Sequence, residues 1–416
     1  MSKEENTKKA KIIQRNIQKP ILELALNRHK MVFLSGPRQA GKTTFSKSFL
    51  SDVSNYKSWD QPSFRKVWTK SSEDFAEQVI GTGFPLIVLD EFHKNKKWKN
   101  QLKGFYDKFG DHIKILVTGS AKLNTFRKGA DSLLGRFNHF HILPFSFGEL
   151  CNPTPWSFST FDSWVQSPTI SDGERKQIQS QENIIENLFK YSGFPEPFIA
   201  RSSELYQIWS QNRNELLIRQ DLRDLSNIIQ IGQVEILANF IPERVGSPLS
   251  LKSLQEDLDG SYTSIQRWMK SLSDVYYHFE VKPYSKSIPR SLKKEGKIYL
   301  FDWCQVENEG ARFENLVALH LLKLVHYYND TGQAKLALSY LRNKDKDEVD
   351  FIITNKGRPL LTIEVKLSDT NLDKTYLKFQ KYTKVTHFQI VKTPNIFNLY
   401  PTAKVISFSN FFWKLP

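Results

Sequence analysis

The sequence predicts an α/β protein whose first 150 residues form a parallel β-sheet with helices on both faces. Short apolar runs at 31–35, 85–90, 113–120 and 138–144 alternate with helical patterns, and this alternation is typical of a parallel sheet. A chain of 416 residues exceeds one ordinary hydrophobic core, so it should divide into about three units.

Four segments follow one another along the chain. The region 12–30 has the pattern of an amphipathic helix that Pro20 breaks or restarts. We expect the sheet within 1–150, a helical connector at 151–230, a two-helix module with two strands at 231–303, and a last α/β domain at 304–416. The start of the connector is rich in Pro, Ser, Thr and aromatic residues, which is typical of a packed linker.

The composition is that of a globular protein, with 39% apolar and 25% charged residues. No segment approaches the ~18 consecutive apolar residues of a membrane span, and the first residues, MSKEENTKKAK, lack the apolar centre of a signal peptide. We therefore expect a cytoplasmic protein without a membrane partner. Cys151 and Cys304 are too few for a disulfide framework or a zinc cluster.

The formal net charge of +15 favours binding of phosphate polyanions, nucleic acid above all, through release of condensed counterions. Lysine-rich surfaces also occur for solubility alone. The charge is therefore compatible with a DNA partner but does not establish one.

A glycine-rich segment with the pattern GxxxxGK[ST] directly follows the first apolar run and precedes a helix, which is the context of a phosphate-binding loop. Glycines allow backbone N–H groups to face the phosphates, Lys42 supplies positive charge to the β and γ oxygens, and Thr43 offers a hydroxyl to Mg²⁺. The sequence therefore predicts an ATP site with Mg²⁺ as cofactor. Its residues are Gly36, Pro37, Arg38, Gln39, Ala40, Gly41, Lys42, Thr43 and Thr44.

Two further apolar runs end in groups that suit ATP hydrolysis. Asp90 would stand at the carboxyl end of its strand, where open α/β sheets place ligands, and would bind Mg²⁺ through water. Glu91 would then act as general base on the attacking water. Thr118 or Ser120, at the end of the next run, could orient that water from the neighbouring strand.

The order of these motifs resembles a widespread prokaryotic family of AAA-type ATPases whose C-terminal domain is described only as of unknown function. The resemblance covers nearly the whole chain. It implies a homo-oligomer, with a ring as the expected form, in which Arg136 reaches the γ-phosphate of the neighbouring subunit; Arg127 is the second candidate. An arginine that satisfies helix C-terminal carbonyls is the alternative. The segments that carry the resemblance are Asp90-Glu91-Phe92-His93-Lys94, Ser132-Leu133-Leu134-Gly135-Arg136-Phe137, Ser192-Gly193-Phe194-Pro195-Glu196, Leu222-Arg223-Asp224-Leu225 and Ile363-Glu364-Val365-Lys366.

Two short helical patterns, at 248–258 and 262–272, flank the turn DGS and suit a helix-turn-helix. The strand-like runs VYYHFEVKPY and KIYLFD would form its wing. This winged helix would contact DNA, and a protein-docking or lid module is the alternative. The second helix offers residue types that contact phosphates or base edges, namely Tyr262, Ser264, Gln266, Arg267 and Lys270.

The last domain resembles the PD-(D/E)xK nuclease core, a small restriction-endonuclease-like α/β fold, with Val349 in place of the proline. Asp350 opens one strand, and Glu364 and Lys366 lie two apart in the next, so they share one face. The resemblance implies that Asp350 and Glu364 bind Mg²⁺ or Mn²⁺ and that Lys366 lowers the pKa of the attacking water; Glu314 could add a ligand. An alternating surface strand with an ordinary ion pair is the alternative.

These features together predict an ATP-dependent DNA-processing ATPase, a motor or remodeller comparable to branch-migration motors that also carry a winged helix. Fold resemblance alone does not establish such a function. The rival hypothesis is an ATP-binding molecular switch in a signalling or defence assembly, whose C-terminal domain only binds partners. DNA-stimulated ATP turnover distinguishes the two.

Overall fold

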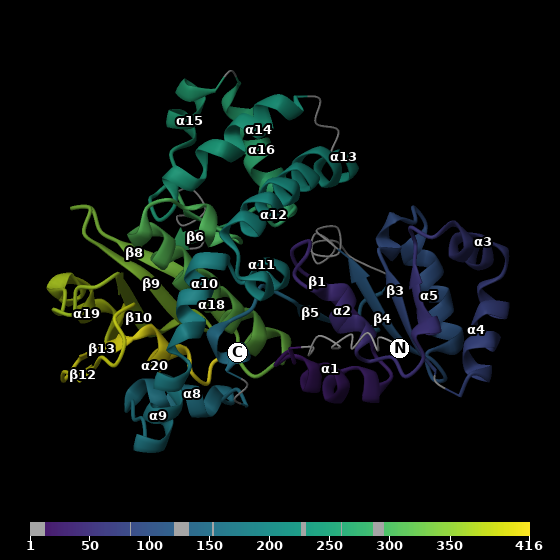
Figure 1. Cartoon of the computed structure of the whole chain (residues 1–416), viewed down its shortest axis with the longest axis horizontal. Coiled ribbons are helices and arrows are strands. Elements are labelled where there is room, and N and C mark those ends of the chain that lie inside the picture. Colours follow the sequence, from purple (N-terminus) through teal and green to yellow (C-terminus); the bar gives the residue numbers. More distant parts are fainter. Residues whose placement is uncertain are drawn as a thin grey trace, which may run out of the picture.

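The computed structural model describes residues 13–83, 85–119, 133–151, 154–225, 230–258, 260–285 and 295–416. Two β-sheets organise them: a five-stranded sheet in the first part of the chain and an eight-stranded sheet that belongs mostly to the last part. Figure 1 shows the first sheet on the right and the second on the left, with α14, α15 and α16 projecting above the second.

The first sheet is parallel throughout, with strand order β2-β3-β4-β1-β5. Its existence and the four strands expected in it are confirmed. The sequence did not indicate β2, because a strand of three residues with polar content carries no clear pattern. The strands are β1 (Met31–Ser35), β2 (Tyr56–Ser58), β3 (Leu86–Asp90), β4 (Lys114–Gly119) and β5 (Phe137–His141).

Alternate residues of these strands point to the two faces of the sheet. Phe33 lies in one apolar cluster with residues of α3, α4 and α5, whereas Val32 and Leu34 lie in another with residues of α1 and α2. Helices therefore cover both faces, as the sequence predicted. Of the helix expected at 12–30, the structure has α1, with Pro20 in its first turn, and a short 3₁₀ turn. The helices are α1 (Gln18–Leu24), α2 (Lys42–Lys47), α3 (Pro62–Lys70), α4 (Ser72–Gly81) and α5 (Trp98–Phe109).

Short helices occupy the middle of the chain. One of them, α12, continues directly into a π-helical turn, Leu216–Asp221. The two helices expected around the turn DGS are confirmed as α15 and α16. The helices are α7 (Phe147–Leu150), α8 (Phe158–Gln166), α9 (Asp172–Ser180), α10 (Glu182–Tyr191), α11 (Pro195–Ala200), α12 (Ser203–Glu215), α13 (Leu222–Leu225), α14 (Ile231–Phe240), α15 (Leu251–Asp257) and α16 (Tyr262–Asp274).

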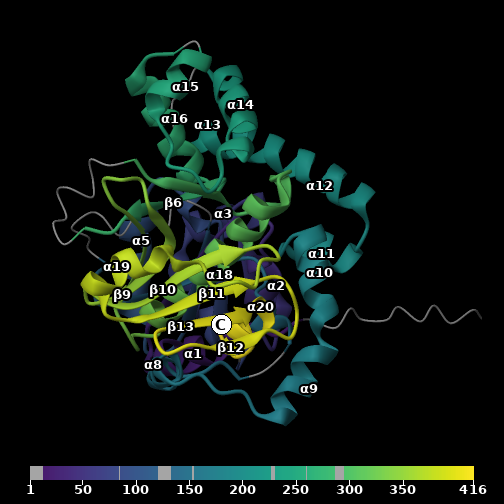
Figure 2. The ribbon, with the colours of Figure 1, turned by 90° about the vertical axis from the view of Figure 1, so that its left-hand side faces the viewer.

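The second sheet is mixed, with strand order β12-β13-β11-β10-β9-β8-β6-β7. Figure 2 shows this sheet facing the viewer, with α18 behind it. The antiparallel pairing of β9 with β10 through the turn TNKGRP is confirmed. The elements are β8 (Leu336–Arg342), β9 (Glu348–Asn355), β10 (Arg358–Lys366), β11 (Thr386–Val391), β12 (Phe397–Leu399), β13 (Ala403–Ser407), α18 (Glu309–Asp330), α19 (Leu377–Thr383) and α20 (Phe408–Phe412).

The two strands expected as a separate wing join the second sheet instead. β6 (His278–Pro283) and β7 (Lys297–Leu300) pair with each other in antiparallel fashion. The far end of β6 also pairs in parallel with β8, through Lys282 with Ser339 and Pro283 with Tyr340. An unpaired strand edge presents free backbone N–H and C=O groups to a neighbouring strand, and β8 offers such an edge to β6. The hairpin is therefore an extension of the sheet formed by residues 304–416.

One apolar cluster runs from the first sheet to the C-terminus. It contains Ile21 of α1, Phe194, Tyr299 and Leu415, so the segments share a buried core. Within the ranges that the structure covers, no helix combines the length and apolarity needed to cross a bilayer.

Candidate functional site

The loop between β1 and α2 has the backbone geometry of a phosphate-binding loop. Gly36 has φ +156°, and a Cβ there would lie 1.9 Å from the carbonyl oxygen of Ile142, so no side chain fits. Gly41 has φ +90° and Gln39 has φ 63°. Gly41 stands at the N-cap of α2, and its left-handed conformation favours glycine. The glycines are therefore required by the turn itself.

Lys42 is folded back into this loop. Its Nζ donates hydrogen bonds to the carbonyl oxygens of Gly36, at 2.9 Å, and Pro37, at 2.7 Å. Burial lowers the pKa of Lys42 to about 8, although Glu91 and Asp90 oppose this shift. The ammonium therefore lies at the loop and is poorly solvated, a state that a phosphate group would relieve.

Asp90, at the carboxyl end of β3, accepts hydrogen bonds from two hydroxyls. Tyr56 donates to one carboxylate oxygen and the buried Thr118 to the other. Burial and the bond to Asp90 raise the pKa of Tyr56, and Tyr56 also interacts with the Thr43 side chain. The sequence offered Thr118 or Ser120 as the residue that orients the water; the structure places the Thr118 hydroxyl on Asp90. Tyr56 went unnoticed because nothing in YKS indicates a binding strand.

Glu91 follows Asp90 and takes a left-handed backbone conformation, with φ 52°. Its Oε2 lies 3.6 Å from the Nζ of Lys94 and 3.6 Å from the Nε2 of His93, and its side chain is 23% exposed. Burial raises the pKa of Glu91, and the charge of Asp90 raises it further. A carboxylate with a raised pKa and partial access to solvent suits a general base.

These groups line one cavity of about 430 Å³. The loop and the end of β3 form part of its wall, with Thr43, Thr44, Asp90 and Glu91 among the lining residues. The hydroxyl of Thr43 and the carboxylate of Asp90 are oxygen donors of the kind that Mg²⁺ prefers. The residues therefore fit the magnesium ion that the sequence implied.

The rest of the wall comes from the helical region. Pro195, Glu196 and Asp221 line the same cavity, and Arg38 Nη1 lies 2.5 Å from Asp221 Oδ1. In the sequence, these residues lie in or beside segments that carry the family resemblance, but the sequence assigned them no role. Their proximity to the phosphate-binding loop depends on how α11 and α12 pack in the folded chain. The loop is thus bonded directly to the π-helical turn that ends at Asp221.

Arg136 lies away from this cavity. It directly precedes β5, at the amino ends of the parallel strands, whereas the loop follows the carboxyl end of β1. Its Nε is 2.6 Å from Asp107 Oδ1, and its Nη2 is 3.1 Å from Asp107 Oδ2. Arg136 therefore does not reach the nucleotide site of its own chain. Ser120 and Arg127 lie outside the described residues.

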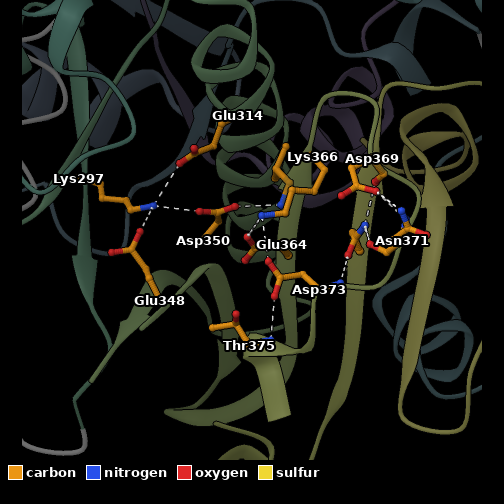
Figure 3. Close-up of polar contacts among 12 residues, drawn as sticks. Lys297, Glu314, Glu348, Asp350, Glu364, Lys366, Asp369, Asn371, Asp373 and Thr375 are labelled. Atoms are coloured by element: carbon orange, nitrogen blue, oxygen red, sulfur yellow. Dashed lines mark hydrogen bonds and ion pairs between the residues drawn. The ribbon is translucent and has the colours of Figure 1, made fainter. Parts of the chain in front are cut away.

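The C-terminal residues form a second polar site, shown in Figure 3. Asp350 on β9 accepts a hydrogen bond from the backbone N–H of Val365 at 2.9 Å. On β10, Lys366 Nζ lies 2.8 Å from Glu364 Oε1 and 3.1 Å from Asp373 Oδ2. The strand pairing thus places the predicted Asp350, Glu364 and Lys366 in one neighbourhood.

A lysine that the sequence did not indicate lies among these carboxylates. Lys297 on β7 has only 1% of its side chain exposed, and its Nζ is 3.2 Å from Glu314 Oε1, 2.6 Å from Glu348 Oε1 and 3.1 Å from Asp350 Oδ1 (Figure 3). Tyr299 OH donates to the same Glu314 oxygen at 2.6 Å. Nothing in the run KIYLFD distinguishes Lys297 from an exposed strand lysine. Its burial among the carboxylates follows only from the pairing that adds β6 and β7 to the second sheet.

Burial gives two acids of this site, Glu364 and Glu314, a high proton affinity. It raises the pKa of Glu364 to about 8, with a further contribution from Asp350. It also raises the pKa of Glu314 to about 7, with Asp350 again adding and Lys297 opposing. Oxygen donors of this kind suit Mg²⁺ or Mn²⁺, but the Lys297 ammonium already supplies one positive charge to Glu314 and Asp350.

Comparison with protein families agrees with the first part of the site. A family model described as an AAA domain matches residues 28–151, and the chain accordingly carries a P-loop ATPase domain of the AAA type, as the sequence predicted. Two models described as domains of unknown function, DUF8612 and DUF4143, match residues 182–304 and 309–415. Neither description includes a winged helix or a nuclease.

Curated relatives match over most of the chain. Uncharacterized protein MJ1544 of Methanocaldococcus jannaschii is 24% identical over 399 residues, covering 91% of this chain and 83% of that protein. Uncharacterized protein Rv2008c of Mycobacterium tuberculosis is 23% identical over 376 residues, covering 86% and 75%. These matches span the ATPase domain and the regions that follow it.

Two solved structures resemble this chain only weakly. AMPPCP-bound DnaA of Aquifex aeolicus gives a TM-score of 0.31 at 12% identity, covering 62% of this chain and 86% of that one. The ORC1 protein of Aeropyrum pernix in complex with DNA gives 0.30 at 15% identity, covering 74% and 94%. TM-scores this low establish no shared arrangement of the whole chain.

Proposed function

We propose that this chain, with its AAA-type ATPase domain, is a Mg²⁺-dependent ATPase that couples ATP hydrolysis to the remodelling of DNA. The observation that supports the proposal is the composition of the cavity wall. The phosphate-binding loop and β3 form one part, and Glu196 and Asp221 of the helical region form another. A change in the bound phosphates would therefore alter contacts to both parts, which is what conversion of ATP energy into movement requires.

Each residue of the cavity then has a role in hydrolysis. Lys42 binds the β and γ oxygens, Thr43 and Asp90 hold Mg²⁺, and Glu91 accepts a proton from the attacking water. Bound Mg²⁺ would supply charge neutralisation at the phosphates. Thr118 positions Asp90 through its hydroxyl. The role of Ser120 stays a prediction from the sequence.

Arg136 is proposed to act on the nucleotide of a neighbouring subunit in a homo-oligomeric ring. Its place at the amino ends of the strands, opposite the loop that follows β1, excludes direct contact with the nucleotide of its own chain. Light scattering with ATP and Mg²⁺ tests the assembly. A monomer that hydrolyses ATP at the full rate would contradict this role.

The proposed DNA-contacting element is α16, the second helix of the two-helix module whose following strands, β6 and β7, extend the second sheet. Ile265, Trp268 and Met269 are buried on one face of this helix. Gln266, Arg267 and Lys270 are exposed on the other. The helix also lies in the part of the molecule that projects above the second sheet (Figure 1). Together with the net charge of +15, this face supports binding to the DNA backbone.

The double substitution Arg267→Ala/Lys270→Ala should weaken DNA binding and reduce DNA-stimulated ATP turnover, because two cationic contacts to phosphate are lost. The slope of log Kd against log salt should fall by about 2. Fluorescence anisotropy at several salt concentrations measures the binding, and phosphate release on single-stranded, duplex and branched DNA measures the turnover.

A matched control removes one arginine and one lysine from a different exposed helix. Arg175→Ala/Lys176→Ala on α9 should keep the DNA affinity of the parent. Equal losses in both double variants would place the contact elsewhere. The rival nucleotide switch would be supported if the parent protein binds no DNA at low salt and hydrolyses ATP slowly at the same rate with and without DNA.

The second site is proposed to cleave phosphodiester bonds with Mg²⁺ or Mn²⁺. The supporting observation is that three chemically different groups, Asp350, Glu364 and Lys366, lie together on paired strands. We expect nicking or cleavage of branched, duplex or single-stranded DNA with Mn²⁺ and ATP, and its loss in Asp350→Asn. Asp345→Asn, a change in the loop before β9, is the control. Cleavage that persists in Asp350→Asn and Lys366→Ala would come from another source. If neither the parent nor any variant cleaves DNA, the domain binds its partner without cleaving it.

A further inference from the structure

Three side chains of metal-ligating types, His141, His326 and Asp330, lie between the first sheet and α18, outside both sites described above. His141 ends β5, and His326 and Asp330 belong to the last two turns of α18. The side chains of His141 and Asp330 are only 2% and 1% exposed. One ligand atom from each of the three residues lies within 4.8 Å of the others.

The sequence positions these groups in two steps. His326 and Asp330 are four residues apart on one helix, so they lie on the same face. β5 then packs against α18 and supplies His141, whose backbone N–H and ring Nδ1 lie 2.9 and 2.8 Å from Asp330 Oδ2. The rings of His141 and His326 are 3.9 Å apart between centroids, with planes inclined by 30°. All three side chains therefore converge on one place.

We propose that His141, His326 and Asp330 bind one divalent transition-metal ion of the zinc class. Two imidazole nitrogens and one carboxylate oxygen are donors that zinc prefers. Tetrahedral ligands at about 2.0–2.1 Å from one zinc ion lie about 3.3–3.4 Å from each other. His141 Nδ1 and Asp330 Oδ2 are 2.8 Å apart, at hydrogen-bond distance, so these two atoms would separate by about 0.5 Å to share an ion. Small side-chain rotations would bring the third ligand to the same ion.

The surroundings indicate a structural ion. A cavity of about 20 Å³ adjoins His141 and His326, which is room for about one water molecule. Water can complete a four-coordinate zinc site, whereas a substrate has no space. Glu149, on the same cavity, is already bonded to Arg15 at 2.8 Å and Lys323 at 2.5 Å, so it is not a ligand here. The ion would join α18 to the ATPase sheet.

The test uses the full chain, purified without a histidine tag and dialysed against Zn²⁺ or Co²⁺ with excess Mg²⁺ to compete at the carboxylate and nucleotide sites. We expect one bound ion per chain by mass spectrometry, a visible Co²⁺ absorption band, and a higher unfolding temperature with Zn²⁺. His326→Gln and Asp330→Asn should each weaken the affinity by at least about tenfold. His112→Gln, which changes an exposed histidine, should bind like the parent.

A parent protein that binds no stoichiometric ion, or a His326→Gln variant with unchanged metal content and unchanged Zn²⁺ stabilisation, would overturn the proposal and leave a buried His141–Asp330 hydrogen bond. Circular dichroism shows whether each variant is folded. If a variant does not fold, the metal content of the parent protein alone decides whether the ion binds. Asp350→Asn should retain the ion, which separates this site from the carboxylates of the second sheet. The outcome is independent of ATP hydrolysis.

Discussion

Glu91→Gln should reduce ATP turnover by about a hundredfold to ten-thousandfold while ATP binding persists, because this is the usual contribution of a positioned general base. The substitution keeps the size of the side chain and removes its negative charge and its ability to accept a proton. Lys42→Ala should instead weaken ATP binding, because Lys42 is the ammonium held in the phosphate-binding loop. Binding of a fluorescent ATP analogue and single-turnover phosphate release measure the two effects separately.

Glu77→Gln is the matched control, since Glu77 is exposed on α4 and should not affect turnover. The pH dependence adds a second check. Burial raises the pKa of Glu91, and a protonated carboxyl cannot act as base, so the turnover of the parent should fall as the pH decreases through that pKa. Hydrolysis by Glu91→Gln at the parental rate would show that another group activates the water.

Lys297→Met should destabilise the protein by about 3–5 kcal/mol, the usual effect of removing one partner from a buried charged group. Methionine preserves much of the aliphatic volume of lysine but leaves Glu314, Glu348 and Asp350 without their shared cation. Chemical denaturation, monitored by circular dichroism, measures the loss. Adding Mg²⁺ or Mn²⁺ should recover part of it, because a divalent cation can replace the ammonium.

Lys282→Met on the same hairpin is the control. Lys282 is 40% exposed and lies 3.5 Å from Glu280, so its loss should change stability by no more than about 0.5 kcal/mol. Equal stability of the two variants would contradict the role of Lys297.

The loss in Lys297→Met should also depend on pH. A carboxyl whose pKa is raised in the folded state binds more protons there than when unfolded, so stability decreases as the pH rises. The pKa of Glu314 is already raised to about 7 in the parent, and removal of the opposing lysine should raise it further. The variant should therefore regain stability as the pH is lowered toward and below 7. A loss that is the same at pH 6 and pH 8 would mean that packing, not charge, is responsible.

Local patterns in the sequence determined the residues of the proposed ATP site. The glycine positions, Lys42, Thr43 and the two acids at the end of β3 occupy fixed places along the chain. The backbone of a strand, a tight turn and a helix follows directly from them. The AAA-type domain was therefore predictable from residues that are near one another in sequence. The same reasoning placed Asp350 opposite the strand of Glu364, because a short turn joins β9 and β10.

Long-range packing decided the rest. Asp221 meets Arg38 across 183 positions, Lys297 meets Asp350 across 53, and His141 meets Asp330 across 189. None of these pairs has a sequence spacing that predicts contact, because each depends on how separate helices and strands pack. The sequence by itself therefore determined the chemistry of the nucleotide loop. Only the tertiary structure decided which distant charges complete its wall, which lysine neutralises the second site, and which histidines converge beside α18, because burying a charged or polar group requires a partner that folding must bring to it.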